Sequence, residues 1–274
     1  MSTTFERVAT HVLLILFAII AVYPLISIVT LSLTPPNETV TGFSLPSEIT
    51  LDNYAVAWRD GNFAEALLNS AIVAVAVVVV SVAFSVLAGY ALGTMRFPGA
   101  TLIFFILITG LIIPYESLII PLYQTFKDWR MLDSLQALIL PQIGVSVTLG
   151  TFWMRGFFRS TPRSVTEAAR VDGAGHFRTL ISVLVPTAWP AILTLSVLIF
   201  MYTWNDFLLA LVMNPSGRVF TAPLALSFFA GAQRVSDQTV VAAAAVLVAI
   251  PVIVFYVFLQ RHFVRGFLTG AVKE

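Results

Sequence analysis

The chain has 274 residues, of which 58% are hydrophobic and 11% are charged, whereas soluble domains carry roughly 25% charged residues. A globule of this size has no interior for all 22 Phe side chains. The net charge of +1 provides no basic surface for nucleic acid, and the absence of cysteine excludes disulfides, thiol catalysis and Cys-ligated zinc. The composition therefore predicts a polytopic membrane protein.

Six runs of the sequence are apolar over the roughly 20 residues that a helix needs to cross a bilayer. They cover about His11–Leu33, Leu67–Leu92, Thr101–Ile120, Ala137–Phe158, Thr187–Met213 and Val240–Leu259. Strands of a membrane barrel are shorter and alternate polar with apolar residues, unlike these runs. We therefore predict an all-α integral membrane protein with six transmembrane helices. Prolines in these runs predict bends or gates, although kinked packing explains them equally well: Pro24, Pro114, Pro141 and Pro251.

The distribution of basic residues predicts the orientation in the membrane. Ten of the 15 Lys and Arg residues fall on the side that holds both termini and the loops after the second and fourth runs. Basic residues concentrate on the cytoplasmic side of membrane proteins, so both termini are expected to be cytoplasmic. The polar insert at about Thr34–Ala66 then lies outside, and it is expected to contain a short amphipathic helix.

Two ionisable residues lie within or beside the outer halves of the predicted helices: Glu116, which follows Pro114, and Asp206. A charge inside a membrane is costly and marks a functional candidate. The alternative is that both carboxylates are solvated or paired at the outer boundary. No carboxylate is evident near mid-membrane, which weakens the hypothesis of a carrier driven by protons or sodium.

The sequence contains no recognisable catalytic set. It has no H-E-x-x-H motif, no Ser/His/Asp arrangement and no P-loop, and its only lysines are Lys127 and Lys273. The chain therefore cannot cradle nucleotide phosphates in a P-loop of its own. If ATP drives transport here, the ATPase must be another subunit.

The loop between the fourth and fifth runs, residues 159–187, carries strong local signals. Ser164 followed by Glu167 three residues later predicts a capping box at the start of a short helix. Gly173 and Gly175 can end that helix in a left-handed turn. A second short helix is expected over Phe177–Leu184. We expect Pro186 to stop that helix, giving a helix–Gly–helix knob; a docking knob and an ordinary capped loop explain the pattern equally well.

The same loop resembles a known signature. The pattern E-A-A-x-x-x-G-x9-I-x-L-P is typical of permease subunits of binding-protein-dependent ABC importers. Its positions here are Glu167, Ala168, Ala169, Gly173, Val183, Val185 and Pro186, with Val replacing Ile and Leu. Asp172-Gly173-Ala174 is similar to the carbohydrate branch. Together with similar segments over about residues 60–274, the chain resembles the shorter, second permease of maltose-type sugar importers.

This resemblance implies a type I ABC importer permease fold in the cell membrane. It implies residues 1–65 as the first helix and an extracytoplasmic segment, 66–259 as the transmembrane domain, and 260–274 as a cytoplasmic tail. It also implies a second homologous permease, two copies of a cytoplasmic ATPase that hold ATP and Mg, and an extracytoplasmic substrate-binding protein. No cofactor is expected on this chain. The residues implied in coupling to the ATPase are Glu167, Ala168, Ala169, Asp172, Gly173 and Pro186.

Sugar sites commonly combine aromatic faces with amide and carboxylate groups, which predicts a substrate pathway. The candidates are Tyr115, Glu116, Trp204, Asn205 and Asp206. Aromatic residues at a membrane boundary are also expected of any membrane protein. Disaccharides, oligosaccharides and sugar phosphodiesters all remain compatible with the sequence. A stand-alone secondary transporter of a small polar solute and a membrane enzyme are the alternatives.

Overall fold

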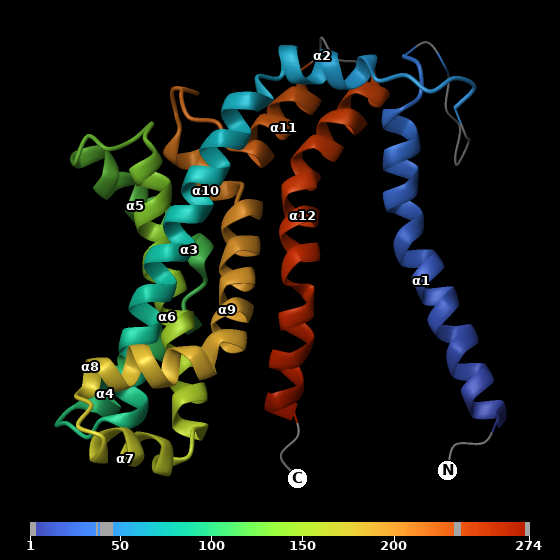
Figure 1. The fold of residues 1–274 in the computed structure, drawn as a ribbon. Coiled ribbons are helices and arrows are strands. Elements are labelled where there is room, and N and C mark those ends of the chain that lie inside the picture. The colour runs from blue at the N-terminus through green and yellow to red at the C-terminus, as the bar shows by residue number, and fades with distance from the viewer. Residues whose placement is uncertain (1–3, 37, 39–45, 233–236, 272–274) are drawn as a thin grey trace. The chain divides into compact units, whose positions relative to one another are not determined.

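The computed structural model describes residues 4–36, 38, 46–232 and 237–271. Throughout this part of the chain the regular elements are helices, which confirms the predicted all-α fold (Figure 1). In chain order the first elements are α1 (Thr4–Ser32), α2 (Asp52–Asp60), α3 (Phe63–Thr94), α4 (Ala100–Ile112), α5 (Tyr115–Asp128) and α6 (Leu135–Ser160). They are followed by α7 (Arg163–Val171), α8 (His176–Thr179), the π-helical η1 (Leu180–Leu184), α9 (Val185–Asn205), α10 (Leu208–Met213), α11 (Ala222–Gly231) and α12 (Gln238–Ala271).

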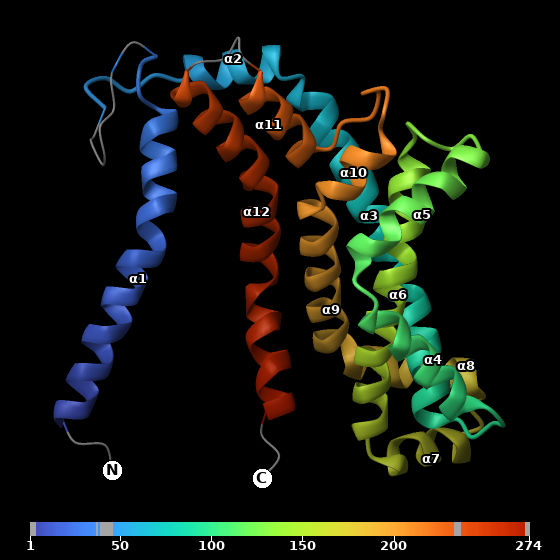
Figure 2. The same ribbon diagram turned by 180° about the vertical axis from the view of Figure 1, so that it is seen from behind.

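Five continuous helical stretches among the described residues are long and apolar enough to cross a membrane. They are Glu6–Ser32, Phe63–Thr94, Leu135–Ser160, His176–Asn205 and Gln238–Phe258. The pair α4 and α5 forms a sixth if it is counted as one broken span, because the two helices bend by 96° at a short break. Figure 2 shows α4 and α5 against α6. The number and approximate positions of the predicted helices therefore match the structure.

The described chain forms two compact units, and the first comprises Met1–Glu65 and Ala225–Pro251. Asn53 of α2 is only 1% exposed and links elements of the first unit through hydrogen bonds. Its amide nitrogen donates to the carbonyl of Ser32, the last residue of α1, at 3.0 Å and to the carbonyl of Thr34, just after α1, at 2.7 Å. Its Oδ1 accepts from the Thr239 hydroxyl at 3.2 Å. The predicted short helix in the polar insert is present as α2, with Asn53 and Ala57 buried on one face.

The second unit comprises Ala66–Leu224 and Val252–Glu274, and its core forms where α3, α6 and α9 pack. α3 approaches α6 closely at Gly89. A Cβ atom placed on Gly89 would lie 2.6 Å from the Cβ of Met154 and 2.9 Å from the backbone nitrogen of Arg155. One turn later, Gly93 lies against the same segment. The G-x-x-x-G pair at the end of α3 therefore serves helix packing.

The third predicted span breaks at Pro114. Ile113 has an extended backbone, with φ −74° and ψ 121°, because proline disfavours the helical conformation of the residue before it. Pro114 then precedes the first residue of α5, and its carbonyl accepts from Ser117 N–H at 3.0 Å. The helix does not break at the other prolines for which a bend was predicted. α1 continues through Pro24, α6 through Pro141 and α12 through Pro251.

The predicted bounds of the fifth span, Thr187–Met213, are wrong at both ends. The helix begins at His176 and ends at Asn205, and Asp206 has an extended backbone with φ −66° and ψ 120°. The Asp206 carboxylate accepts the N–H of Leu209 at 3.1 Å, so its side chain starts α10 as a separate helix. At the C-terminal end, the predicted tail 260–274 continues α12 as far as Ala271; residues 272–274 lie outside the described part.

Candidate functional site

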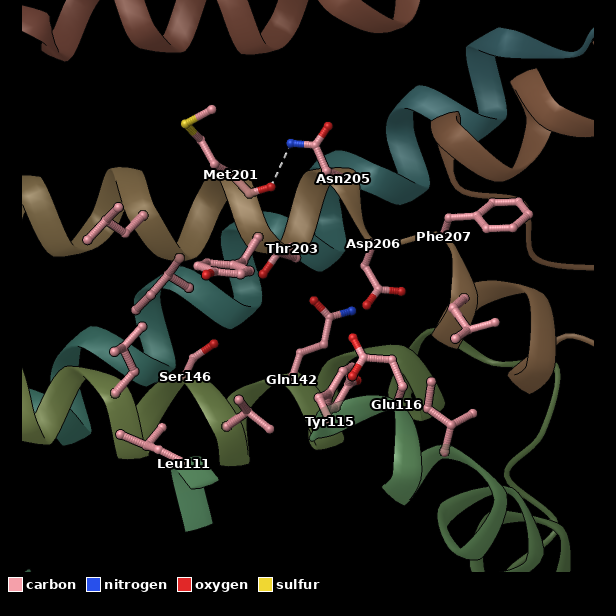
Figure 3. A pocket seen from close by; sticks show the side chains of 17 residues that line it. Leu111, Tyr115, Glu116, Gln142, Ser146, Met201, Thr203, Asn205, Asp206 and Phe207 are labelled. Carbon is pink, nitrogen blue, oxygen red and sulfur yellow. Dashed lines mark hydrogen bonds between the residues drawn. The ribbon is translucent and has the colours of Figure 1, made fainter. Parts of the chain in front are cut away.

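A cavity of about 860 Å³ lies within the second unit. Its walls come from α5, α6, α9 and the segment that connects α9 to α10, with Leu111 of α4 at one edge (Figure 3). Such a volume falls within the range of small-molecule sites, roughly 300–1,000 Å³. The cavity is therefore the candidate site for a small ligand.

The polar lining of the cavity combines carboxylates, amides and hydroxyls from three helices. α5 contributes Tyr115 and Glu116, α6 contributes Gln142 and Ser146, and α9 with the residue after it contributes Tyr202, Thr203, Asn205 and Asp206. Gln142 and Ser146 lie one turn apart and thus on one face of α6. In Figure 3 the side chains of Glu116, Gln142 and Asp206 point toward a common space. This set can form many hydrogen bonds with a polyhydroxylated ligand.

Several of these polar groups have hydrogen-bonding capacity left. The Thr203 side chain is 6% exposed, and its hydroxyl has no hydrogen-bond partner among the described residues; the buried hydroxyl of Tyr115 is in the same state. Asn205 donates to the Met201 carbonyl at 2.8 Å, which leaves its amide oxygen available. A buried polar group without a partner costs roughly 1–3 kcal/mol, so a ligand or water that pairs with these groups is favoured.

Four of the five predicted pathway residues line the cavity, and Trp204 does not. Its side chain is 4% exposed and stacks on Phe200 with ring centroids 5.4 Å apart. On a helix, consecutive residues point about 100° apart, so Trp204 faces the protein core while Thr203 faces the cavity. The sequence analysis missed Gln142 and Ser146. Their signal is present, because two polar residues at i and i+4 interrupt an otherwise apolar run.

The loop of residues 159–187 forms the second candidate site, and its first helix is α7. Gly173 has a φ of +77°. Its N–H donates to the Arg170 carbonyl at 3.0 Å, and the N–H of Ala174 donates to the Ala169 carbonyl at 2.9 Å. These two bonds define a Schellman motif, so the predicted left-handed end of the helix is confirmed at Gly173. Gly175 has a φ of −69° and takes no part in that turn.

The predicted capping box is wrong. α7 begins at Arg163 after Pro162, and no side chain caps its first turn. Pro162 occupies the N-cap position, and its carbonyl accepts the N–H of Val165 at 3.1 Å, so the first turn forms before Ser164. Glu167 and Ala168 are exposed, whereas Ala169 is 7% exposed. The polar side chain of Glu167 is therefore available to another molecule.

The second half of the loop also differs from the prediction, because Pro186 does not stop the helix. α8 runs into the π-helical segment η1, where Val185 N–H donates to the Leu180 carbonyl, and then into α9. Pro186 lies in the first turn of α9. The wider π turn carries the chain past Pro186, whose nitrogen has no hydrogen to donate in an α-helical ladder. Residues His176–Asn205 are therefore one continuous helical stretch.

The chain is similar in sequence to several transport proteins. It is 35% identical over 254 residues, 92% of this chain and 93% of the relative, to the trehalose transport system permease protein SugB of Mycobacterium tuberculosis. It is 31% identical to the diacetylchitobiose uptake system permease protein NgcG of Streptomyces coelicolor, over 97% of this chain and 87% of that protein. A solved bacterial ABC transporter that imports the acidic polysaccharide alginate matches with a TM-score of 0.78 and 28% identity, over 96% of this chain and 99% of the other.

The helical membrane fold, with an open cavity that places eight polar side chains among nine apolar ones, is consistent with a membrane transport component. Residues 82–269 match the model of the family described as binding-protein-dependent transport system inner membrane component. The chain belongs to this family and is a permease subunit of an ABC transporter, located in the cell membrane with several spans. Permease subunits of this kind are not enzymes, since the ATPase is a separate subunit.

Proposed function

We propose that this chain forms half of the translocation pathway of an ATP-driven sugar importer. The observation that carries this proposal is the cavity, because a wall of two carboxylates, two amides and four hydroxyls suits a polyhydroxylated cargo. The relatives SugB and NgcG are named as permeases for trehalose and diacetylchitobiose, which supports a carbohydrate cargo for this chain as well.

We propose that the 159–187 loop couples this chain to the ATPase. Glu167 and Ala168 are exposed on α7, and the apolar side chains of Val171 and Phe177 are 89% and 70% exposed beside them. Exposed apolar residues of this size indicate a protein–protein contact. The coupling set consists of Glu167, Ala168, Ala169, Asp172, Gly173 and Pro186; the buried Ala169 and the Gly173 turn would fix its shape.

The assembly proposed around the chain has four further components. A second homologous permease completes the pathway, two copies of an ABC ATPase bind ATP and Mg, and a substrate-binding protein delivers the sugar. With both termini and the 159–187 loop in the cytoplasm, the ATPases lie on the loop side and the binding protein on the side of the polar insert. This chain itself carries no cofactor in this scheme.

The coupling proposal is tested by Glu167→Lys in the full transporter, purified in lipid nanodiscs with its partner subunits. ATP hydrolysis is measured with and without the binding protein, first with trehalose and diacetylchitobiose. We expect Glu167→Lys to reduce the stimulated rate at least about tenfold, because a reversed charge on α7 opposes docking at a contact worth a few kcal/mol. Glu167→Asp is the matched control, since it retains the negative charge at the same exposed position of α7.

Wild-type stimulation of ATP hydrolysis in Glu167→Lys would overturn the coupling role of the loop. Sugar uptake by the purified chain alone, driven by an ion gradient without ATP, would instead support a secondary transporter. The two results are distinct, so each part of the proposal can fail separately.

A further inference from the structure

We propose that the cavity selects its cargo by charge: it accepts uncharged and cationic sugars and disfavours anionic ones such as sugar phosphates and uronates. This inference rests on the proposed function, because it assigns a cargo class to the cavity that we place on the translocation pathway. It narrows the candidates left open by the sequence by excluding sugar phosphodiesters.

The charge of the cavity wall is one-sided. Glu116 and Asp206 both line the cavity, and in Figure 3 their carboxylates point into the same space from opposite walls. None of the 17 described residues that line it is Lys, Arg or His. Within the described part of the chain neither carboxylate forms an ion pair. Within the described part of this chain, no basic residue therefore neutralises their negative charge at the cavity.

The rest of the wall points to a ligand that offers hydroxyl groups. Gln142, Ser146 and Thr203 are 8%, 9% and 6% exposed, and all three line the cavity. The Thr203 hydroxyl is buried and has no hydrogen-bond partner among the described residues. Neutral hydroxyls and amides recognise a polyol without regard to its charge. The two carboxylates then decide which polyols enter, since they accept hydrogen bonds from hydroxyl or ammonium groups and repel phosphate or carboxylate groups.

The effect of two carboxylates on an anion in such a space is large. Charges a few ångströms apart interact more strongly at the edge of a low-dielectric region than in water, because solvent screens them less. A cavity lined by one sign of charge changes the local concentration of ions by about 10-fold to 1000-fold. We therefore expect a discrimination between cation and anion of at least about tenfold.

The chain has no cysteine, which allows a direct measurement of this potential. Ser146→Cys places one thiol on the cavity wall of the assembled transporter. Its reaction rates with a trimethylammonium-bearing and a sulfonate-bearing methanethiosulfonate are measured on this chain by mass spectrometry, without nucleotide and after vanadate trapping. The ratio of the rates is divided by the same ratio for free mercaptoethanol, which removes the intrinsic difference between the two reagents. Val145→Cys, on the same wall, is a second reporter.

We expect a normalised cation-to-anion ratio of at least about ten at Ser146→Cys, falling at least about fivefold when Glu116→Gln and Asp206→Asn are combined. A ratio near one, a ratio that the double neutralisation leaves unchanged, or thiols that react with neither reagent in either state would overturn the proposal. The measurement without nucleotide needs neither transport nor ATP hydrolysis. Failure of the coupling proposal, seen with Glu167→Lys, is therefore distinguishable from failure of charge selection.

Discussion

Buried polar residues of this chain fall into two groups that serve different purposes. Asn53 is buried with both sides of its amide hydrogen-bonded to α1 and to Thr239, so it stabilises the first unit. Thr203 is equally buried, but its hydroxyl has no hydrogen-bond partner in the described chain and it faces a cavity. Neither burial nor a missing partner alone identifies a functional residue here, because Ser81 and Thr151 are also buried without a partner; the position of Thr203 on the cavity wall sets it apart.

The backbones of α3 and α6 approach each other closely at Gly89, which leads to a prediction for adding one methyl group there. A Cβ at this position would overlap Met154, so Gly89→Ala forces α3 and α6 apart and is expected to destabilise the chain by roughly 1–3 kcal/mol. Thermal unfolding of the purified transporter in detergent should show a midpoint several degrees lower. Gly156→Ala on α6 is the control, because its Cβ would meet nothing within 4 Å. Equal midpoints for the two variants would contradict the packing shown here.

Among the elements, the end of α7 offers a matched pair of glycines two residues apart. Gly173→Ala forces an L-residue to a φ of +77°, at a cost of roughly 1–2 kcal/mol, while Gly175→Ala retains an allowed φ of −69°. Gly173→Ala should loosen the Schellman turn and speed tryptic cleavage at Arg170 and Arg178 several-fold. Gly175→Ala should be cleaved at the wild-type rate. Equal cleavage of both variants would show that the turn does not depend on Gly173.

Long apolar helices were predictable, and their ends were not. α3 and α6 match the predicted runs to within a few residues, because length and hydropathy decide whether a segment spans a membrane. The ends of the fifth span depend on local backbone chemistry instead. Asp206 ends α9 and starts α10 with its side chain, and a π turn carries the helix past Pro186. Hydropathy contains no information on either event.

The cavity was predictable in part for a similar reason. Glu116 and Asp206 were found because a carboxylate in an apolar run is conspicuous, and Tyr115 and Asn205 adjoin them in sequence. Trp204 was included because it adjoins them too, yet the helical rotation turns it away from the cavity. Gln142 and Ser146 stand out as polar residues on one face of an apolar helix, but only the packing of α6 against α5 and α9 shows that this face lines a cavity.

For the whole molecule, fold and cargo are set by different parts of the chain. The alginate importer shares the fold of this chain at a TM-score of 0.78 and takes part in the import of an acidic polysaccharide. The cavity described here has two carboxylates and no basic residue among its described lining residues. The charge selection proposed above would thus give two proteins of one fold cargoes of different charge, since function lies in sites rather than in folds.

The proposed assembly leads to a prediction that purification can check. The sequence has no P-loop, so ATP-driven transport requires a separate ATPase subunit. We expect the tagged chain, purified in mild detergent from its native host, to retain a second permease and an ATPase with a P-loop, identified by mass spectrometry. Under the same conditions, a tagged membrane protein of another family should retain neither. A lone, monodisperse chain that is stable without partners would contradict this expectation.

The continuous helical stretch His176–Asn205 joins the two candidate sites of the second unit. Its first part, which includes η1, belongs to the 159–187 loop, and the cavity residues Asn205 and Asp206 lie at its other end. Figure 1 shows that the stretch turns sharply between α8 and α9, where the π-helical segment Leu180–Leu184 lies. A change in the angle of this turn would move the loop relative to the cavity wall without breaking the helix, because no loop residue separates the two parts.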